Sequence, residues 1–319
     1  MVKAFTFPGQ GSQVVGMGKE FYDNFSVAKQ VFEEVDSTLN RKLSQTIFDG
    51  PIDVLTRTDN AQPAIMATSI AVLRVLEQES GQNISQICNF VAGHSLGEYT
   101  ALCACGALSL SDTTRLLDIR GRSFETASEQ NVGSMCALLG GNIMLVMTLL
   151  DAVRENEDVN LKIQIANDNT VGQVVISGHE HLIDKAVSIA TNFGFKKAVK
   201  LNVSGAFHSE LMQSAVEEMT DALQNITINT SPINFISNVT AKITNSPEEI
   251  KLNLIRQITG AVRWRETLLN FKTNKVDKIV EIGAKTLTPF VSRTIEDGVS
   301  ALSINSIEVL KAELYDFTI

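Results

Sequence analysis

A short apolar segment, a tight turn and an alanine-rich segment follow one another between residues 87 and 107. Residues 87–92 (Ile-Cys-Asn-Phe-Val-Ala) have the composition of a largely buried strand, and residues 96–107 that of a helix. The turn between them reads Gly-His-Ser-Leu-Gly. Flanking glycines let the strand and helix pack closely around a strained serine whose hydroxyl is lifted out of the sheet. The pattern therefore predicts an α/β fold with Ser95 as a nucleophile, and the strand and helix disfavour an ordinary loop serine.

Two backbone N–H groups are candidates for stabilising an anion beside this serine. The start of the helix offers unpaired N–H groups, and that of Leu96 can point at an oxyanion. A second loop, Phe-Pro-Gly-Gln-Gly-Ser-Gln at residues 7–13, follows a predicted strand over residues 4–7. Glycine-rich loops of this kind present backbone N–H groups to anions. It resembles a phosphate-binding loop only loosely, because no Gly-Lys-Ser/Thr follows.

A serine nucleophile needs a base, and the chain contains four histidines. His94 directly precedes Ser95, so its side chain is expected to point away from the hydroxyl. His179 and His181 lie where a predicted strand turns into a helix, which suits capping or surface roles. His208 lies in Gly-Ala-Phe-His-Ser, just before a predicted helix. Elimination makes His208 the candidate base, although a lone histidine is also compatible with a structural role.

One arginine shares the apolar face of a helix predicted over residues 111–127, for which Ser111 is the expected N-cap. Arg120 lies four residues after Leu116 and three after Leu117, which places it on their face. An arginine that faces the core needs an anionic partner. That partner is either a carboxylate of the protein or a carboxylate of a substrate, which a guanidinium can hold with two hydrogen bonds.

The middle of the chain changes character near residue 133. Strand and helix patterns follow in the order β-α-β-β-α-β, over residues 134–139, 143–155, 161–166, 174–177, 181–192 and 195–202. Residues 167–170 (Asn-Asp-Asn-Thr) are expected to form a turn between two of these strands. This order is that of the ferredoxin-like fold. We therefore expect a small subdomain over residues 133–202, inserted into a larger domain made of residues 1–132 and 203–319.

The larger part should contain further helices and strands. Helices are predicted over residues 14–22, 26–39 and 64–79, and strands over residues 233–238 and 278–282. Pro63 is expected near the start of the third helix, where its missing N–H costs nothing.

Composition excludes several classes of function. The length of 319 residues allows one large domain or two ordinary ones, and an apolar share of 44% is enough for a sizeable core. A formal net charge of −9 argues against nucleic acid, which needs a basic face. No run approaches the roughly 20 apolar residues that cross a bilayer, and Pro8 interrupts the N-terminus too soon for a secretory signal. The four cysteines have no Cys-x-x-Cys pair or metal-type spacing, so we expect reduced thiols, no metal and a cytoplasmic protein.

Six motifs, in their order along the chain, resemble those of a known family. They are Phe-Pro-Gly-Gln-Gly-Ser-Gln at residues 7–13, Gln-Pro-Ala at 62–64, Gly-His-Ser-Leu-Gly-Glu-Tyr at 93–99, Arg-Gly-Arg at 120–122, Gly-Ala-Phe-His-Ser at 205–209 and Arg-Gln-Ile-Thr-Gly-Ala-Val-Arg-Trp at 256–264. With this set the chain resembles the malonyl-CoA:acyl-carrier-protein transacylase family of bacterial fatty-acid synthesis over nearly its whole length. The resemblance implies an α/β-hydrolase-like large domain of three layers, helix, sheet and helix, with a ferredoxin-like insertion.

The resemblance also implies a catalytic role for several residues. Ser95 would be the nucleophile and His208 the general base and acid. Gln257 would take the place of the usual triad acid and orient His208 as a neutral acceptor. The backbone N–H groups of Gln10 and Leu96 would form the oxyanion hole. The implied chemistry needs no cofactor and no metal.

Four further residues would recognise the substrate. Arg120 would bind the malonyl carboxylate, and Phe207 matches the form associated with malonyl rather than methylmalonyl units. Gln62 and Asn167 would line the site. The implied reaction transfers a malonyl group from malonyl-CoA to the phosphopantetheine thiol of acyl carrier protein, through a malonyl-serine ester.

Two other functions stay open at this point. A serine esterase or thioesterase would share the elbow, but Arg120 and the lack of a convincing acid after Ser95 argue against hydrolysis. A non-catalytic carrier-binding module has little support, because both Ser95 and His208 are present. The family's carrier proteins are acidic, so a basic rim is a candidate docking patch, with scattered solvated charges as the alternative. Its members would be Lys196, Lys197, Lys200, Arg263 and Arg265. We expect a monomer.

Overall fold

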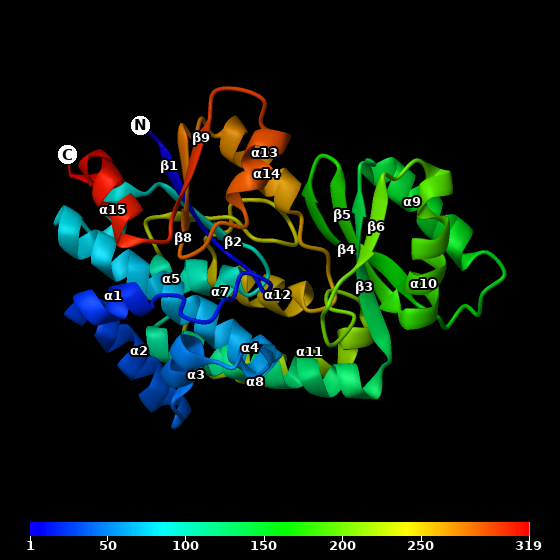
Figure 1. Cartoon of the computed structure of the whole chain (residues 1–319), viewed down its shortest axis with the longest axis horizontal. Helices are drawn as coiled ribbons and strands as arrows, with labels where there is room; N and C mark the ends of the chain where they lie inside the picture. The colour runs from blue at the N-terminus through cyan, green and yellow to red at the C-terminus, as the bar shows by residue number, and fades with distance from the viewer. Residues whose placement is uncertain (319) are drawn as a thin grey trace.

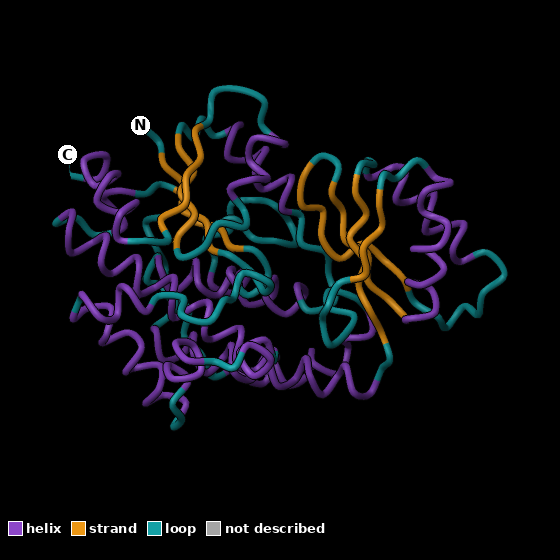
Figure 2. Tube along the Cα trace, viewed as in Figure 1, coloured by secondary structure: helices purple, strands orange, loops and turns teal. Residues whose placement is uncertain are grey.

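The structure, a computed structural model that describes residues 1–318, contains two β-sheets (Figures 1 and 2). The larger sheet has five parallel strands in the order β7-β2-β1-β8-β9. Its strands are β1 (Lys3–Phe7), β2 (Phe90–Gly93), β7 (Asn234–Phe235), β8 (Lys278–Ile282) and β9 (Ser300–Ile304). The smaller sheet is antiparallel, in the order β4-β5-β3-β6. Its strands are β3 (Gly133–Leu139), β4 (Ile163–Thr170), β5 (Gln173–His179) and β6 (Lys197–Lys200).

Helices pack on both faces of the parallel sheet (Figure 1). They are α1 (Lys19–Asn24), α2 (Ser26–Leu39), α3 (Leu43–Asp49), α4 (Ile52–Thr56), α5 (Thr58–Ser80), α6 (Ile84–Ile87), α7 (Gly97–Ala104), α8 (Leu110–Gln130), α11 (Gln213–Gln224), α12 (Pro247–Gln257), α13 (Trp264–Thr273), α14 (Thr288–Thr294) and α15 (Ile307–Glu313). Phe5 and Phe7 of β1 join the apolar cluster that contains α2, α5, α7 and α8. Ala4 points the other way, into the cluster that contains Trp264 and Leu268 of α13. Burial on both faces explains why most residues of β1, β2 and β8 are apolar.

The small sheet has its own layer of helices. α9 (Ile143–Arg154) and α10 (Glu180–Ile189) cover one face, where Cys136 and Leu138 belong to a separate apolar cluster. The alternate residues Met135 and Ala137 point to the opposite face and join the core that they share with the helices of the parallel sheet. Within residues 1–318, every helix is too short or too polar to span a lipid bilayer.

The carboxyl ends of β1 and β2 lie next to each other. Phe7 and Gly93 are register partners in these parallel strands, and the N–H of His94 donates to the carbonyl of Phe7 over 2.9 Å. The glycine-rich loop after β1 and the serine turn after β2 therefore leave the sheet side by side. In open α/β sheets, this edge is where ligands bind.

Several predicted boundaries are wrong, for local reasons. The helix predicted from residue 14 begins only at Lys19, because Gly16 and Gly18 adopt positive φ and the chain turns there. The N-cap of α8 is Ser109 rather than Ser111: the Ser109 hydroxyl accepts the N–H of Asp112 over 3.0 Å.

Two further corrections concern segments that contain polar residues. Residues 167–170 are strand rather than turn, since β4 runs through them with two register shifts and the chain reverses after them. Helix α5 begins at Thr58, so Pro63 lies inside the helix and not at its start. Strand β9 was not predicted at all.

Candidate active site

Ser95 occupies the sharp turn between β2 and α7. Its φ of 54° lies in the left-handed region, which is strained for a residue with a side chain. The flanking glycines make the turn possible: a Cβ on Gly93 would collide with the backbone of Gly97, and a Cβ on Gly97 would collide with the carbonyl of Phe7. The local sequence therefore forces β2, α7 and the loop after β1 into close contact, with the serine at their junction.

The Ser95 hydroxyl lies 2.8 Å from Nε2 of His208. His208 is 3% exposed, and its Nδ1 lies 2.8 Å from the backbone carbonyl of Gln257. A carbonyl can only accept, so Nδ1 carries the proton and a neutral ring has its lone pair on Nε2. Burial, followed by the nearby charge of Arg120, lowers the pKa of His208 to about 3. The ring is therefore neutral near pH 7 and can accept the proton of the serine.

Gln257 touches the site with two different groups. Its backbone carbonyl accepts from His208, whereas the hydrogen bonds of its side chain go to other groups. The side-chain Nε2 donates to the carbonyl of Ser95 over 2.9 Å and to the carboxylate of Glu98. Its Oε1 accepts from Nη2 of Arg120 over 2.9 Å. A substitution of this side chain therefore acts on Arg120 and the serine turn before it acts on the histidine.

Arg120 is buried, with 1% of its surface exposed, and all three of its hydrogen bonds go to neutral oxygens. These acceptors are Oε1 of Gln62 at 2.8 Å, Oε1 of Gln257 at 2.9 Å and Oγ of Ser95 at 3.1 Å. Its Nε has no partner within residues 1–318. The guanidinium also lies 4.3 Å from the ring centre of Phe124. Among the described residues, the protein carboxylate considered as a partner for Arg120 is not found.

A cavity of about 90 Å³ lies over the serine and histidine. Its lining residues are Gln10, His94, Ser95, Arg120, Phe124, Met135, Asn167, Leu201, Val203, Phe207 and His208. Asn167 comes from β4, so both sheets contribute to the cavity. The ring of Phe207 packs against that of Phe124, with 5.2 Å between centres. Gln62, Gln257 and Leu96 are not part of the lining; Gln62 reaches the site only through Arg120.

The two loops of the sheet edge carry two candidate oxyanion donors, the backbone N–H groups of Gln10 and Leu96, at or next to residues that line this cavity. Gln10 lines it, and Leu96 directly follows the serine at the start of α7. Among the hydrogen bonds within residues 1–318, none uses the backbone N–H of Gln10 or Leu96. Unused N–H groups beside a nucleophile are what a developing oxyanion requires.

The other histidines are engaged elsewhere. Nε2 of His94 lies 2.8 Å from Oδ1 of Asn169, so this ring lines the cavity without binding the serine hydroxyl. His179 accepts the N–H of Lys162 over 2.8 Å, and the exposed His181 lies 3.3 Å from Glu157. These contacts leave His208 as the one histidine in the described chain that reaches the serine.

The proposed basic rim is largely paired with carboxylates. Lys200 binds Glu180 and Asp184, Arg263 binds Glu266, and Arg265 binds Asp168. Lys196 and Lys197 are exposed. Of the predicted rim, only these two lysines are therefore exposed without a carboxylate partner among the described residues, as docking of an acidic protein would require.

Two residues that the sequence analysis missed support the serine turn. Asn238, just after β7, accepts the N–H of Ser95 with Oδ1 over 2.8 Å and donates to the carbonyl of Gly93 over 2.6 Å. Glu98, in the first turn of α7, accepts the N–H of Asn238 over 2.8 Å. A glutamate three residues after a nucleophile, on a helix otherwise free of charge, is the signal that could have identified Glu98.

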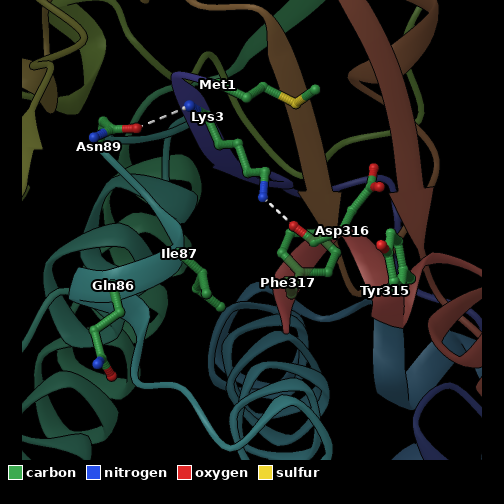
Figure 3. A pocket seen from close by; sticks show the side chains of 8 residues that line it. All are labelled: Met1, Lys3, Gln86, Ile87, Asn89, Tyr315, Asp316 and Phe317. Atoms are coloured by element: carbon green, nitrogen blue, oxygen red, sulfur yellow. Dashed lines mark hydrogen bonds between the residues drawn. The ribbon is translucent and has the colours of Figure 1, made fainter. Parts of the chain in front are cut away.

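Size does not single out the cavity over Ser95, because larger ones lie elsewhere. One of about 500 Å³ shares Gln10 and Val203 with it and extends to Ile52 and Asp53. A cavity of about 410 Å³ lies beside the two chain ends, lined by residues such as Lys3, Asn89 and Tyr315 (Figure 3). It contains none of the residues that surround Ser95. The chemistry therefore points to the smaller cavity at the carboxyl edge of the sheet.

Comparison with known proteins agrees with this geometry. The acyl transferase domain family matches residues 4–313. The malonyl CoA-acyl carrier protein transacylase of Bacillus subtilis (strain 168) is 42% identical over 291 residues, which are 91% of this chain and 89% of that protein. The acyl-carrier-protein S-malonyltransferase of Bartonella henselae is 46% identical, with a TM-score of 0.95 and full coverage of both chains.

A third comparison includes a partner protein. The solved complex of a type II PKS acyl-carrier protein with its malonyl-transacylase matches with a TM-score of 0.93 and 32% identity, over 99% of this chain and 100% of that one. The family model covers nearly the whole chain, and the relatives align over nearly their whole length. The chain belongs to the acyl transferase family, in its malonyl CoA-acyl carrier protein transacylase branch.

Proposed function

We propose that this protein transfers a malonyl group from malonyl-CoA to the phosphopantetheine thiol of acyl carrier protein, as part of fatty-acid synthesis. The names of its relatives support the substrate and the acceptor. The observation that carries the proposal is the Ser95–His208 pair at 2.8 Å beside Arg120, a buried guanidinium that binds only neutral groups. A serine that is hydrogen-bonded to a histidine base suits acyl transfer. A buried guanidinium whose hydrogen bonds go to no carboxylate suits an acyl group that brings one.

In the first half of the reaction, Ser95 is the nucleophile. Nε2 of His208 takes the proton of Oγ as a bond forms between Oγ and the thioester carbon of malonyl-CoA. The carbon–sulfur bond then breaks, and the CoA sulfur takes the proton from His208. The products are free CoA thiol and a malonyl ester on Ser95.

The second half reverses these steps with a different thiol. The phosphopantetheine sulfur of the carrier protein gives its proton to His208 and attacks the ester carbon. The bond to Oγ breaks, and the proton returns to Ser95. In both halves the backbone N–H groups of Gln10 and Leu96 are the proposed donors to the oxyanion.

Recognition of the acyl group rests on Arg120 and Phe207. The guanidinium receives the malonyl carboxylate, and its unpartnered Nε supplies one of the donors. Phe207 and Phe124 close the cavity next to it, which leaves little room for a branch on the malonyl carbon. Gln62 orients Arg120, and Asn167 contributes a polar group from β4.

The test is the intact mass of the protein after mixing with malonyl-CoA. We expect an adduct of one malonyl group that disappears on addition of carrier protein bearing phosphopantetheine. Ser95→Ala removes the hydroxyl and should give no adduct, while Ser12→Ala, in the nearby loop after β1, is the matched control. Absence of an adduct on the native protein contradicts the enzymatic proposal, and loss of the adduct to water as fast as to carrier supports a thioesterase instead.

The finer architecture also belongs to this proposal. Residues 1–132 with 203–319 would form an α/β-hydrolase-like domain, and residues 133–202 a ferredoxin-like insertion. The β-α-β-β-α-β order, the strand order β4-β5-β3-β6 and a separate apolar cluster support the insertion. A monomer in the cytoplasm completes the proposal; the free, buried thiols of Cys88, Cys103, Cys105 and Cys136 fit a reducing compartment.

A further inference from the structure

Glu98 is a fully buried carboxylate that the reaction described above does not use. It lies in the first turn of α7, three residues after Ser95, and is 0% exposed. A buried carboxylate is costly unless its oxygens are satisfied. Both oxygens bind neutral donors here: Oε1 accepts the backbone N–H of Asn238 over 2.8 Å, and Oε2 accepts the side-chain amide of Gln257.

The Gln257 amide lies between this carboxylate and Arg120. A guanidinium can only donate and a carboxylate can only accept, so one orientation of the amide satisfies both neighbours. Nε2 must face Glu98, and Oε1 must face Arg120, as the contacts show. The amide therefore connects a buried anion to a buried cation while it keeps them apart.

We infer that Glu98 is a positioning residue for the acyl group's carboxylate. Through Gln257 it holds Arg120 in the orientation that receives the malonyl group, and it supplies a nearby counter-charge without using the donors of Arg120 itself. A direct ion pair would compete with the substrate, because both would bind the same guanidinium. This inference rests on the proposed function, since it assumes that Arg120 binds a carboxylate.

The same carboxylate also supports the nucleophile. Asn238, whose backbone binds Oε1 of Glu98, accepts the N–H of Ser95 with its side chain over 2.8 Å. Gln257 Nε2 binds the Ser95 carbonyl over 2.9 Å. Glu98 thus supports both sides of the serine peptide as well as the arginine. Its loss should slow transfer of every acyl group, and that of malonyl most, because only malonyl also uses Arg120.

Protonation of Glu98 would disrupt this arrangement, because a protonated oxygen becomes a donor that faces the amide donor of Gln257. Burial raises the pKa of Glu98 to about 7, while its hydrogen bonds and Arg120 on α8 act in the opposite direction. The other ionisable groups around Ser95 and Glu98 are Tyr99, with a pKa raised to about 12, His208, with a pKa lowered to about 3, and His94, whose pKa burial lowers from its ordinary value. None of them gains or loses charge as pH drops through about 7.

The experiment compares malonyl-CoA with acetyl-CoA, which lacks the carboxylate, in transfer to carrier protein. In Glu98→Gln the new amide must direct its oxygen at the N–H of Asn238, so its NH₂ meets the NH₂ of Gln257. We expect kcat/KM for malonyl-CoA to fall at least about tenfold more than that for acetyl-CoA, a difference of about 1.4 kcal/mol. Glu98→Asp, which keeps the charge, should restore part of the malonyl preference.

The pH profile supplies a readout that a merely structural role would not change. In the native protein, the ratio of malonyl to acetyl transfer should fall as pH drops through about 7, and this dependence should vanish in Glu98→Gln. Glu281→Gln is the matched control: Glu281 is equally buried and accepts the N–H groups of Leu287 and Thr288, but lies outside the cavity. It should lose stability and keep both the ratio and the pH profile.

The outcomes separate this inference from the proposed function. A native protein that transfers no malonyl group overturns both. A native protein that transfers malonyl, with a ratio independent of pH between 6 and 8, overturns the role of Glu98 alone, even if Glu98→Gln does not fold. A folded Glu98→Gln that retains the native ratio also overturns it.

Discussion

Arg120 is the residue on which the proposed preference for a carboxylated acyl group rests. Its charge is buried, on a helix face that also carries Leu116 and Leu117. The groups that hold it are amide and hydroxyl oxygens, which orient the guanidinium without neutralising it. The periodicity of α8 predicts that Arg120 is buried. Only the contacts in the folded protein show that its guanidinium forms no ion pair with a protein carboxylate in the described residues.

Replacement of Arg120 by alanine should remove the preference for malonyl-CoA. Loss of a buried, hydrogen-bonded charge partner costs about 2–5 kcal/mol, so kcat/KM for malonyl-CoA should fall by about 30-fold or more. Transfer from acetyl-CoA should fall less, because its acyl group has no carboxylate. The measurement is the ratio of the two kcat/KM values.

A neighbouring arginine on the same helix provides the control. Arg122 is exposed and pairs with Asp118 over 2.7 Å, so Arg122→Ala should leave the ratio unchanged. Arg120→Lys keeps the charge but cannot bind a carboxylate in the bidentate geometry of a guanidinium. We expect its ratio of malonyl to acetyl kcat/KM to lie between those of the native protein and Arg120→Ala. Equal losses for both acyl donors in Arg120→Ala would show that the arginine only stabilises the site.

The strand–turn–helix of the serine shows what can be predicted at the level of elements. The glycines around Ser95, the apolar β2 and the alanine-rich α7 agree with one another, so the turn could be identified from local sequence alone. The same holds for the helix of residues 26–39, which is predicted with the observed bounds.

Other parts of the fold and site depend on distant contacts. β4 continues through Asn167–Thr170, residues with turn-like composition, because β5 and the segment at Val262 pair with it. The backbone carbonyl of Gln257 orients His208 from 49 residues away, and no side-chain pattern marks a carbonyl. Asn238 likewise reaches Ser95 only after β7 has paired with β2. Local patterns could not contain this information.

Gly97→Ala should test the tight packing of the turn. The added Cβ would meet the carbonyls of Phe7 and Pro8, so β1 or α7 must shift. Overpacking of this kind costs about 1–3 kcal/mol of unfolding free energy, and the shift should also displace the Ser95 hydroxyl and abolish malonyl adduct formation. The measurements are denaturant unfolding and the intact mass after mixing with malonyl-CoA.

Gly81→Ala separates stability from activity. Gly81 ends α5 with a φ of 68° and has free space around it, so an alanine there is strained by about 1 kcal/mol without any collision. This variant should be less stable than the native protein and fully active. A Gly97→Ala protein that still forms the adduct at the native rate would contradict the packing argument.

At the scale of the whole molecule, the site lies where the two sheets meet. Ser95 follows β2 of the parallel sheet and Arg120 lies on α8, which packs in the core beneath that sheet, whereas β4 of the small sheet contributes Asn167. β4 also holds the base: Nε2 of Gln164 donates to the carbonyl of His208 over 3.1 Å and to that of Thr259 over 2.9 Å. The two sheets must therefore keep a fixed relation for the cavity to exist.

An ion pair at this junction should control that relation. Nε of Arg265, on α13, donates to both oxygens of Asp168 on β4, at 3.1 and 2.9 Å. The Asp168 N–H also donates to the carbonyl of Val262 over 2.9 Å. Asp168→Asn keeps the shape and removes the charge, and because Arg265 is partly exposed we expect a loss of about 1–2 kcal/mol.

The loss should loosen β4 relative to α13 without altering the hydrogen bonds of Arg120, the proposed partner of the malonyl carboxylate. Hydrogen exchange of the β4 amides should therefore increase, and KM should rise for malonyl-CoA and acetyl-CoA alike, with their ratio unchanged. Lys200→Ala, which breaks exposed pairs within the small sheet's own unit, is the control and should change neither quantity. If β4 exchange stays at the native rate in Asp168→Asn, the backbone bridge to Val262 holds the junction. If only the KM for malonyl-CoA changes, Asp168 acts on Arg120 rather than on the relation between the sheets.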